Sequence, residues 1–148
     1  MQGQNARIGY VAKIDTASLK VVDECIVGYQ PEEMAIVGDK LYVANSGGYR
    51  VPNYDRTVSV IDLTTFTEIN KIDVAINLHR ITPDNYGNLY VSSRGDYYHT
   101  PSKTFIIDTR TDKVIGEIAD LPNSNMTLCR DSLYVYSTEW SYVNNDWT

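Results

Sequence analysis

Residues 40–62 read KLYVANSGGYRVPNYDRTVSVID, and the order of features in this stretch decides the fold. A Leu-Tyr-Val strand core leads into a loop of polar and aromatic residues, and a second strand then ends in Ile-Asp. The Leu-Tyr-Val triplet begins at residues 41, 89 and 133, and the Ile-Asp pair ends at residues 15, 62 and 108. Successive copies are 44 to 48 residues apart. Such a period is typical of stacked supersecondary units.

Each repeat is expected to hold four short strands, because short apolar runs alternate with polar residues and are separated by turn residues such as Gly38-Asp39. In the best-preserved unit we predict strands at 31–37, 40–45, 57–62 and 68–74. In the next unit we predict them at 78–83, 88–93, 103–108 and 114–119. Strand pairs flank these units at 8–15 with 21–27 and at 126–130 with 132–137. No window has helical periodicity, so we expect almost no helix.

Four-stranded units of this length, arranged radially, are the blades of a β-propeller. The sequence predicts two complete blades and two half-blades in an all-β fold, with repeat units at about 8–45, 57–93 and 103–137. A closed ring needs roughly four to eight blades. We therefore expect residues 1–148 to be a single propeller segment of a ring of roughly seven blades. The alternative is that two copies assemble end to end and complete a ring of about six blades.

Composition excludes several classes of function. The net charge is -6, and the Lys and Arg residues form no basic stripe, which argues against nucleic-acid binding. No apolar run approaches the roughly 18 residues of a membrane-spanning helix, and the polar N-terminus lacks the apolar core of a signal peptide. Cys25 and Cys129 lie in apolar strand patterns, and we predict that both are buried free thiols.

Three parts of the best-preserved repeat carry a family resemblance: GYQPE at 28–32, DKLYVAN at 39–45 and TVSVID at 57–62. They resemble the YncE-like, surface-layer-type β-propellers, the YVTN repeat group. The Tyr- and Asn-rich loops look most like the Bacteroidetes branch of that group. The later repeats replace the Gly-x-x-Pro corner by Ile-Asn-Leu-His at 76–79 and by Leu-Pro-Asn at 121–123. Because the motif consists mostly of blade-building residues, it is specific for the fold and says little about function.

The resemblance implies a cellular location and a function. Relatives in the Bacteroidetes branch are secreted or surface-anchored lipoproteins, and some accompany outer-membrane nutrient transporters, including a propeller that captures cobalamin. The resemblance therefore implies a protein of the cell surface or periplasm that binds a ligand, with cobalamin as the leading candidate and an outer-membrane transporter as a partner. It implies no cofactor.

The candidate site lies in loops that share one face of a propeller, where second strands join third strands and fourth strands join first strands. The long loops predicted at 46–56, 93–102 and 137–148 hold many of the rings, whereas the turns of the opposite face are short. Aromatic rings on a rigid scaffold, with Asn and Arg beside them, suit a planar or weakly polar small molecule or a glycan. The predicted ligand-binding residues are Tyr49, Arg50, Tyr54, Asn77, His79, Arg94, Tyr97, Tyr98, Trp140 and Tyr142. The alternative is that these rings pack on one another and stiffen the loops.

The recurrent aspartates Asp15, Asp62 and Asp108 suggest a metal or catalytic role, but we predict a structural one. Each precedes a tight turn whose N–H groups a carboxylate can accept, and a structural residue is expected to recur in every blade. The chain has no His-x-x-x-His or Cys-x-x-Cys spacing for zinc. Asp55, Asp96 and Asp146 lack the dense acid pattern of a calcium loop. No nucleophile elbow, P-loop or dinucleotide fingerprint is present.

These observations predict a protein that is not an enzyme, with no catalytic residue, metal or cofactor. Two alternatives remain open. One is a protein-interaction or surface-layer scaffold propeller that uses the same face. The other is a calcium-dependent lactonase- or lyase-type enzyme, which needs acids and Asn to converge at the central channel. Glu32, Glu33 and Asn45 are the nearest candidates, and the other repeats do not match them.

Overall fold

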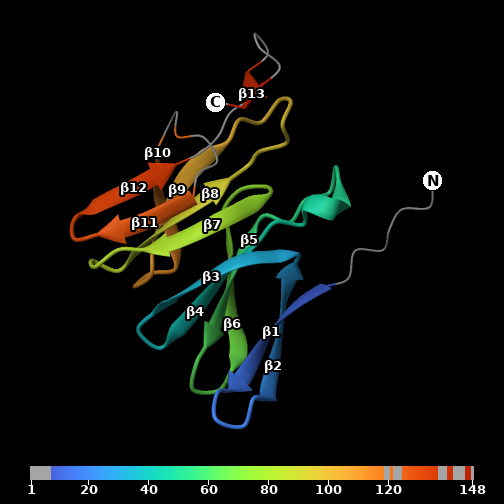
Figure 1. Cartoon of the computed structure of the whole chain (residues 1–148), viewed down its shortest axis with the longest axis vertical. Helices are drawn as coiled ribbons and strands as arrows, with labels where there is room; N and C mark the ends of the chain where they lie inside the picture. Colours follow the sequence, from blue (N-terminus) through green and yellow to red (C-terminus); the bar gives the residue numbers. More distant parts are fainter. Residues whose placement is uncertain (1–7, 119–120, 122–124, 137–139, 142–145, 148) are drawn as a thin grey trace, which may run out of the picture.

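In a computed structural model, the described residues (8–118, 121, 125–136, 140–141 and 146–147) form a row of antiparallel sheets (Figure 1). Blade A consists of β3 (Pro31–Val37), β4 (Lys40–Asn45), β5 (Thr57–Asp62) and β6 (Thr67–Asp73). Blade B consists of β7 (Leu78–Pro83), β8 (Asn88–Ser93), β9 (Lys103–Asp108) and β10 (Lys113–Ile118). Both are four-stranded sheets in which each strand pairs with its neighbour in the sequence.

Half-blades flank the two complete blades, as the sequence predicted. The N-terminal half-blade pairs β1 (Ile8–Asp15) with β2 (Lys20–Tyr29), and the C-terminal half-blade pairs β11 (Asn125–Cys129) with β12 (Ser132–Tyr136). Figure 1 shows the two half-blades at opposite ends of the row. This arrangement confirms an all-β fold of propeller blades. The outer strands β2, β6 and β10 each begin one residue earlier than predicted.

The repeat in the sequence is also a repeat in strand pairing. Leu41 lies opposite Ile61 in blade A, and Leu89 lies opposite Ile107 in blade B. Because side chains alternate between the two faces of a strand, Tyr42 and Ala44 enter one core while Leu41 and Val43 enter another. The central strands are therefore buried on both faces, which explains why they are apolar along most of their length.

Two hydrophobic cores hold the row together. One joins the facing sides of blades A and B, and its fully buried members include Val60, Leu78, Leu89 and Ile107. The other lies between the N-terminal half-blade and blade A, where Val27 packs with residues of β4 and β5. Burying one large apolar side chain contributes about 1.5–3 kcal/mol. The inner strands β3 and β7 are also in contact, and β11 contacts β7, so neighbouring sheets pack against each other through their inner strands.

The recurrent aspartates cap turns, as predicted. Asp62 Oδ1 accepts the N–H groups of Thr64 and Thr65, both at 2.8 Å. Asp15 Oδ1 accepts the N–H groups of the second and third residues after it, at 3.0 and 2.6 Å. Asp108 accepts from both the side chain and the backbone of Arg110, at 2.8 and 3.0 Å. Hydrogen bonds to the charged carboxylate lower the pKa of all three groups.

Two predictions need correction. Cys25 is a buried free thiol, but the free thiol of Cys129 is exposed, because the described part of the chain places no further sheet over that face of β11–β12. The predicted loop 137–148 contains a short pairing of β13 (Trp140–Ser141) with β14 (Asp146–Trp147). The expectation of almost no helix is confirmed, because the described residues contain no helix other than a single 3-10 turn, Gly48–Arg50, in the loop after β4. No helix among the described residues is long and apolar enough to cross a membrane.

Candidate functional site

The loops that join second to third strands lie beside the corners that join one sheet to the next. Their backbones are hydrogen-bonded together: Ser46 N–H donates to Gln30 O, and Arg94 N–H donates to Asn77 O, both at 3.0 Å. Between them is a hollow of about 520 Å³, the loop concavity. Its rings are Tyr49, Tyr54, Tyr97 and Tyr98, and its polar side chains are Gln30, Glu32, Asn77 and Arg94. This volume is within the ~300–1,000 Å³ range of small-molecule sites.

Asn77 ties both long loops to one corner. Its backbone N–H donates to Asp55 O of the first loop, and its side-chain Nδ2 donates to Gly95 O of the second, both at 3.0 Å. Its φ is 54°, a left-handed conformation that Asn tolerates better than most residues. Gln30 holds the equivalent corner with a φ of 49°. Asn77 is 2 % exposed, and its Oδ1 has no hydrogen-bond donor in the structure.

Glu32 organises the floor of the loop concavity across both blades. Its Oε1 accepts hydrogen bonds from Gln30 Nε2 at 2.9 Å, from Ser46 Oγ at 3.0 Å and from Arg94 Nη1 at 3.3 Å. Gln30 Oε1 in turn accepts the N–H of Tyr49 at 2.9 Å. The carboxylate on β3 therefore fixes the starts of both long loops through charge-assisted hydrogen bonds.

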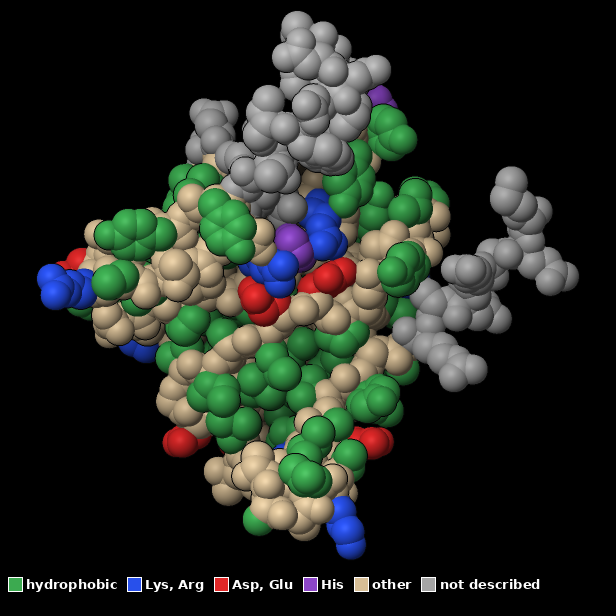
Figure 2. Space-filling view, in the orientation of Figure 1, with side chains coloured by type: hydrophobic (Ala, Val, Ile, Leu, Met, Phe, Trp, Pro, Cys, Tyr) green, Lys and Arg blue, Asp and Glu red, His purple; other side chains and the backbone are tan. Residues whose placement is uncertain are grey.

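A second ion pair lies beside this floor. Glu33 Oε1 is 3.3 Å from Arg80 Nη1, and Glu33 Oε2 accepts the N–H of Ile81 at 2.8 Å. Figure 2 shows acidic and basic side chains gathered around a histidine near the centre of the view. Asn45, the other residue considered for an enzymatic site, is fully buried and donates to Ser59 Oγ and Thr57 Oγ1. The three candidates Glu32, Glu33 and Asn45 thus have separate partners and do not converge.

Of the long loops, the two that the structure describes in full, 46–56 and 93–102, are each closed by an aspartate. Asp55 accepts the N–H groups of Tyr29 and Thr57, at 2.7 and 3.0 Å. Asp96 Oδ1 accepts three consecutive N–H groups, from Tyr98, His99 and Thr100, at 2.7 to 2.9 Å. These backbone hydrogen bonds, led by that of Thr100, lower the pKa of Asp96 to about 2. In the part of the chain that the structure describes, no three His, Cys, Asp or Glu residues could hold a metal ion together.

The rings at the rim are presented to solvent. Tyr98 is 88 % exposed, and Tyr49 and Tyr97 are also mostly exposed, so these three rings do not pack closely on one another. Tyr54 is half-buried, and desolvation raises the pKa of its phenol, with Tyr97 and Asp96 adding to the effect. The loop backbones are fixed by hydrogen bonds while most of their rings stay accessible.

Six of the ten predicted residues line the loop concavity: Tyr49, Tyr54, Asn77, Arg94, Tyr97 and Tyr98. Arg50 lies outside it, because its guanidinium stacks on the ring of Tyr29 at 3.8 Å and lines a neighbouring hollow. His79 is half-buried on β7 and does not line the concavity. The side chain of Trp140 and all of Tyr142 lie outside the described residues.

The prediction of ligand-binding residues omitted Gln30 and Glu32, which form the floor. Both stand at the Gly-x-x-Pro corner, Gln30 directly before the proline and Glu32 directly after it. This corner is the signal that could have identified them, since it is where a first strand enters the long-loop face.

No protein-family model matches the chain, and no curated protein matches it. Among solved structures, hydrazine synthase of Kuenenia stuttgartiensis is similar, with a TM-score of 0.63 and 27 % sequence identity. The match covers 78 % of this chain and 31 % of that protein, so the chain spans about a third of its length. Hydrazine synthase contains a β-propeller, and the likeness supports the propeller fold.

Proposed function

We propose that this chain is a binding segment of a β-propeller and that its long-loop face takes up a ligand without catalysis. The loop concavity carries the proposal. It combines exposed rings on fixed backbones with a floor of hydrogen-bonded polar side chains, as in small-molecule sites, where rings supply contact area and polar groups fix orientation.

The acidic groups of this face are already engaged in holding the protein together. Glu32 accepts three hydrogen bonds, and Asp55 and Asp96 accept backbone N–H groups of the loops. A general acid or base must reach the proton that it transfers. These contacts therefore favour a binding role over a calcium-dependent lactonase or lyase.

Cobalamin is the specific ligand that we propose, on the resemblance to YncE-like propellers of the Bacteroidetes branch. On this proposal the protein works at the cell surface or in the periplasm and passes its ligand to an outer-membrane transporter. A corrin is a broad, largely apolar ring system, and the exposed Tyr49, Tyr97 and Tyr98 offer faces on which it can stack. A glycan is the competing ligand, because sugar rings also stack on tyrosine.

A titration of the chain with cobalamin, followed by the absorbance of the corrin, tests the proposal. We expect saturable binding at micromolar concentrations, and we expect Tyr97→Ala with Tyr98→Ala to weaken it about tenfold or more, as loss of a stacking pair would. The control is Tyr86→Ala, because Tyr86 is also exposed but lies in the short turn between β7 and β8.

The possible results distinguish a wrong choice of ligand from a wrong choice of site. Binding of glycans but not of cobalamin, lost in the same double variant, would keep the site and replace the ligand. Binding that the double variant leaves unchanged would show that the concavity is not the site. If the intact protein binds neither ligand, and a pull-down with it recovers an outer-membrane protein, the long-loop face serves as a scaffold for protein contacts.

A further inference from the structure

Asn77 holds an unused hydrogen-bond acceptor at the loop concavity. Its side-chain amide has a fixed orientation, because Nδ2 donates to Gly95 O at 3.0 Å and a carbonyl oxygen can only accept. The other end of the amide, Oδ1, is therefore an acceptor. It is buried, and it accepts no hydrogen bond from any residue that the structure describes. A buried acceptor without a donor is unfavourable, so a donor brought by a ligand would be bound there.

Gly48 lies over this oxygen. Both residues line the loop concavity, and a Cβ added to Gly48 would be 3.5 Å from Asn77 Oδ1 and from both ends of the Gln30 amide. These are ordinary van der Waals separations, so the oxygen is covered by a residue without a side chain, across a space that one methyl group would fill. A ligand donor reaches Oδ1 when the turn Gly48–Arg50 moves slightly aside.

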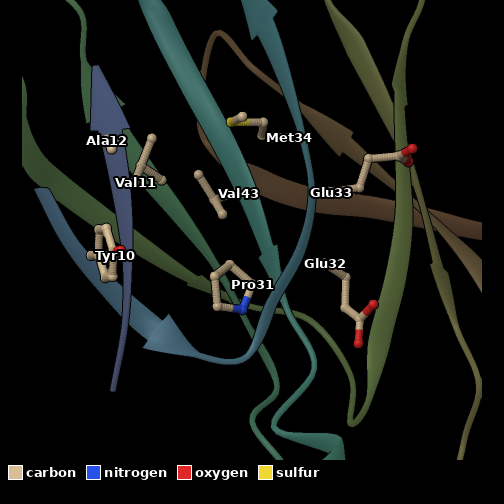
Figure 3. A pocket seen from close by; sticks show the side chains of 8 residues that line it. All are labelled: Tyr10, Val11, Ala12, Pro31, Glu32, Glu33, Met34 and Val43. Atoms are coloured by element: carbon tan, nitrogen blue, oxygen red, sulfur yellow. The ribbon is translucent and has the colours of Figure 1, made fainter. Parts of the chain in front are cut away.

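The charged side chains that line the described concavity neutralise each other. They are Glu32 and Arg94, which form an ion pair at 3.3 Å. Figure 3 shows the carboxylate of the next residue, Glu33, apart from that of Glu32 and against β7, where it accepts the N–H of Ile81 at 2.8 Å. A charged ligand would lose its hydration in the concavity without gaining an unpaired counter-charge. The concavity therefore favours an uncharged ligand.

We propose that Asn77 Oδ1 is the recognition acceptor of the loop concavity, and that it takes an N–H or O–H donor from an uncharged ligand whose flat part stacks on the tyrosines. This inference rests on the proposed function, because it requires that the concavity binds a ligand, and it adds the chemical class of that ligand. The amide groups of a corrin and the hydroxyl groups of a sugar both supply such a donor. A ligand that presents only acceptors at this point leaves the oxygen unpaired and is rejected.

Pairs of small aromatic probes that differ in one donor test the proposal. Benzamide has N–H groups and methyl benzoate has none, and benzyl alcohol with benzyl methyl ether is the corresponding hydroxyl pair. Titration of the intact chain, followed by the NMR resonances of Gly48, Asn77 and Gly95, measures their affinities. In at least one pair we expect the donor to bind about tenfold tighter than its partner, which leaves Oδ1 unpaired. A preference in the amide pair favours a corrin, and a preference in the hydroxyl pair favours a sugar.

Gly48→Ala separates the acceptor from the rest of the site. The new methyl group fills the space over Oδ1 at ordinary contact distances, and Gly48 is not in the left-handed region, so the variant should fold normally. We expect the donor-bearing probe to fall to the affinity of its partner, while the partner is unchanged. Gly116→Ala on β10 is the matched control, since a Cβ there also makes an ordinary contact, 3.8 Å from Ile106 Cδ1, and it should keep the preference.

Asn77→Gly is a second variant that keeps the left-handed corner, which glycine adopts readily, and removes the acceptor. It should also abolish the preference. A preference that survives both variants, or equal affinities within both pairs, would overturn the role of Asn77. If the probes in that case are still lost from Tyr97→Ala with Tyr98→Ala, the concavity remains a binding site and the proposed function stands. If neither cobalamin nor any probe binds, the proposed function fails and this inference fails with it.

Discussion

Tyr42 joins two blades through both parts of its side chain. The ring is fully buried in the core between blades A and B, and the hydroxyl donates to Asp112 Oδ1 of blade B at 2.8 Å. Lys40 Nζ reaches the same carboxylate at 2.9 Å. Desolvation, with the hydrogen bond to Asp112, raises the pKa of Tyr42, so the phenol stays neutral and remains a donor. Tyr42 is thus a tie between blades A and B.

Tyr42→Phe removes this tie without emptying the core. The ring still fills its site, but Asp112 loses one of its two donors in a partly buried place. We expect the free energy of unfolding to fall by ~1–3 kcal/mol, the usual cost of an unsatisfied buried partner. Urea unfolding followed by circular dichroism measures it. Tyr98→Phe is the control, and its exposed ring should change stability by less than ~0.5 kcal/mol. Equal losses in the two variants would disprove the tie.

Asp96 makes the second long loop sensitive to acid. Its pKa in the folded protein is about 2, below the ordinary value of 3.8, because the ionised carboxylate accepts three N–H groups. A lowered carboxyl pKa contributes stability that is complete above the ordinary value and is lost as the pH falls through the folded value. We therefore expect the amide resonances of residues 98–100 to keep their positions down to about pH 4 and to shift with a midpoint near 2. In Asp96→Asn this transition should be absent, and a midpoint near 4 in the native chain would contradict the assignment.

At the scale of elements, glycine allows the long loops to close tightly. Gly95 has a φ of 63°, and a Cβ at this position would overlap the carbonyl oxygen of Thr100 on the returning side of the loop. Gly47 has a φ of 55°, and a Cβ there would overlap the backbone nitrogen of Asp55 on the returning side of the first loop. Both loops thus begin with a left-handed glycine over which the returning chain passes closely. This crossing holds the returning side of each loop close to its start.

Gly95→Ala should displace loop 94–102, and Gly38→Ala gives a matched control. Gly38 also has a positive φ, 57°, but a Cβ there meets nothing within 4 Å. Backbone strain alone should cost ~1–2 kcal/mol in Gly38→Ala. We expect Gly95→Ala to lose more stability and, in addition, to weaken ligand binding, because the overlap moves Tyr97 and Tyr98. Thermal unfolding and a ligand titration measure the two effects. Similar stability losses with unchanged affinity would show that the close crossing does not shape the concavity.

Strands were easier to predict than the site because their signals are local. Alternation and turn residues located β4, β5, β8 and β9 to the residue. The site depends on contacts between distant residues, such as the ion pair of Glu32 with Arg94 from the next blade. The stack of Arg50 on Tyr29 also depends on how a corner meets a loop, and no local pattern indicates it. The exposure of Cys129 depends on which sheet covers β11, which strand periodicity does not report.

At the scale of the whole molecule, each sheet is stabilised chiefly by its neighbours. Blade A is covered by the N-terminal half-blade on one face and by blade B on the other. The C-terminal half-blade touches blade B through β11 and β7, and its strand β12 is mostly exposed. In such a row, stability is close to a sum of unit and interface terms. Local opening should therefore be easiest at the ends.

Hydrogen exchange followed by mass spectrometry can measure this gradient. At low protein concentration we expect amides of β4, β5 and β8 to exchange slowest and those of β11–β12 to exchange fastest, because a lone two-stranded sheet is marginally stable in water. Uniform exchange along the row would contradict the neighbour-by-neighbour account.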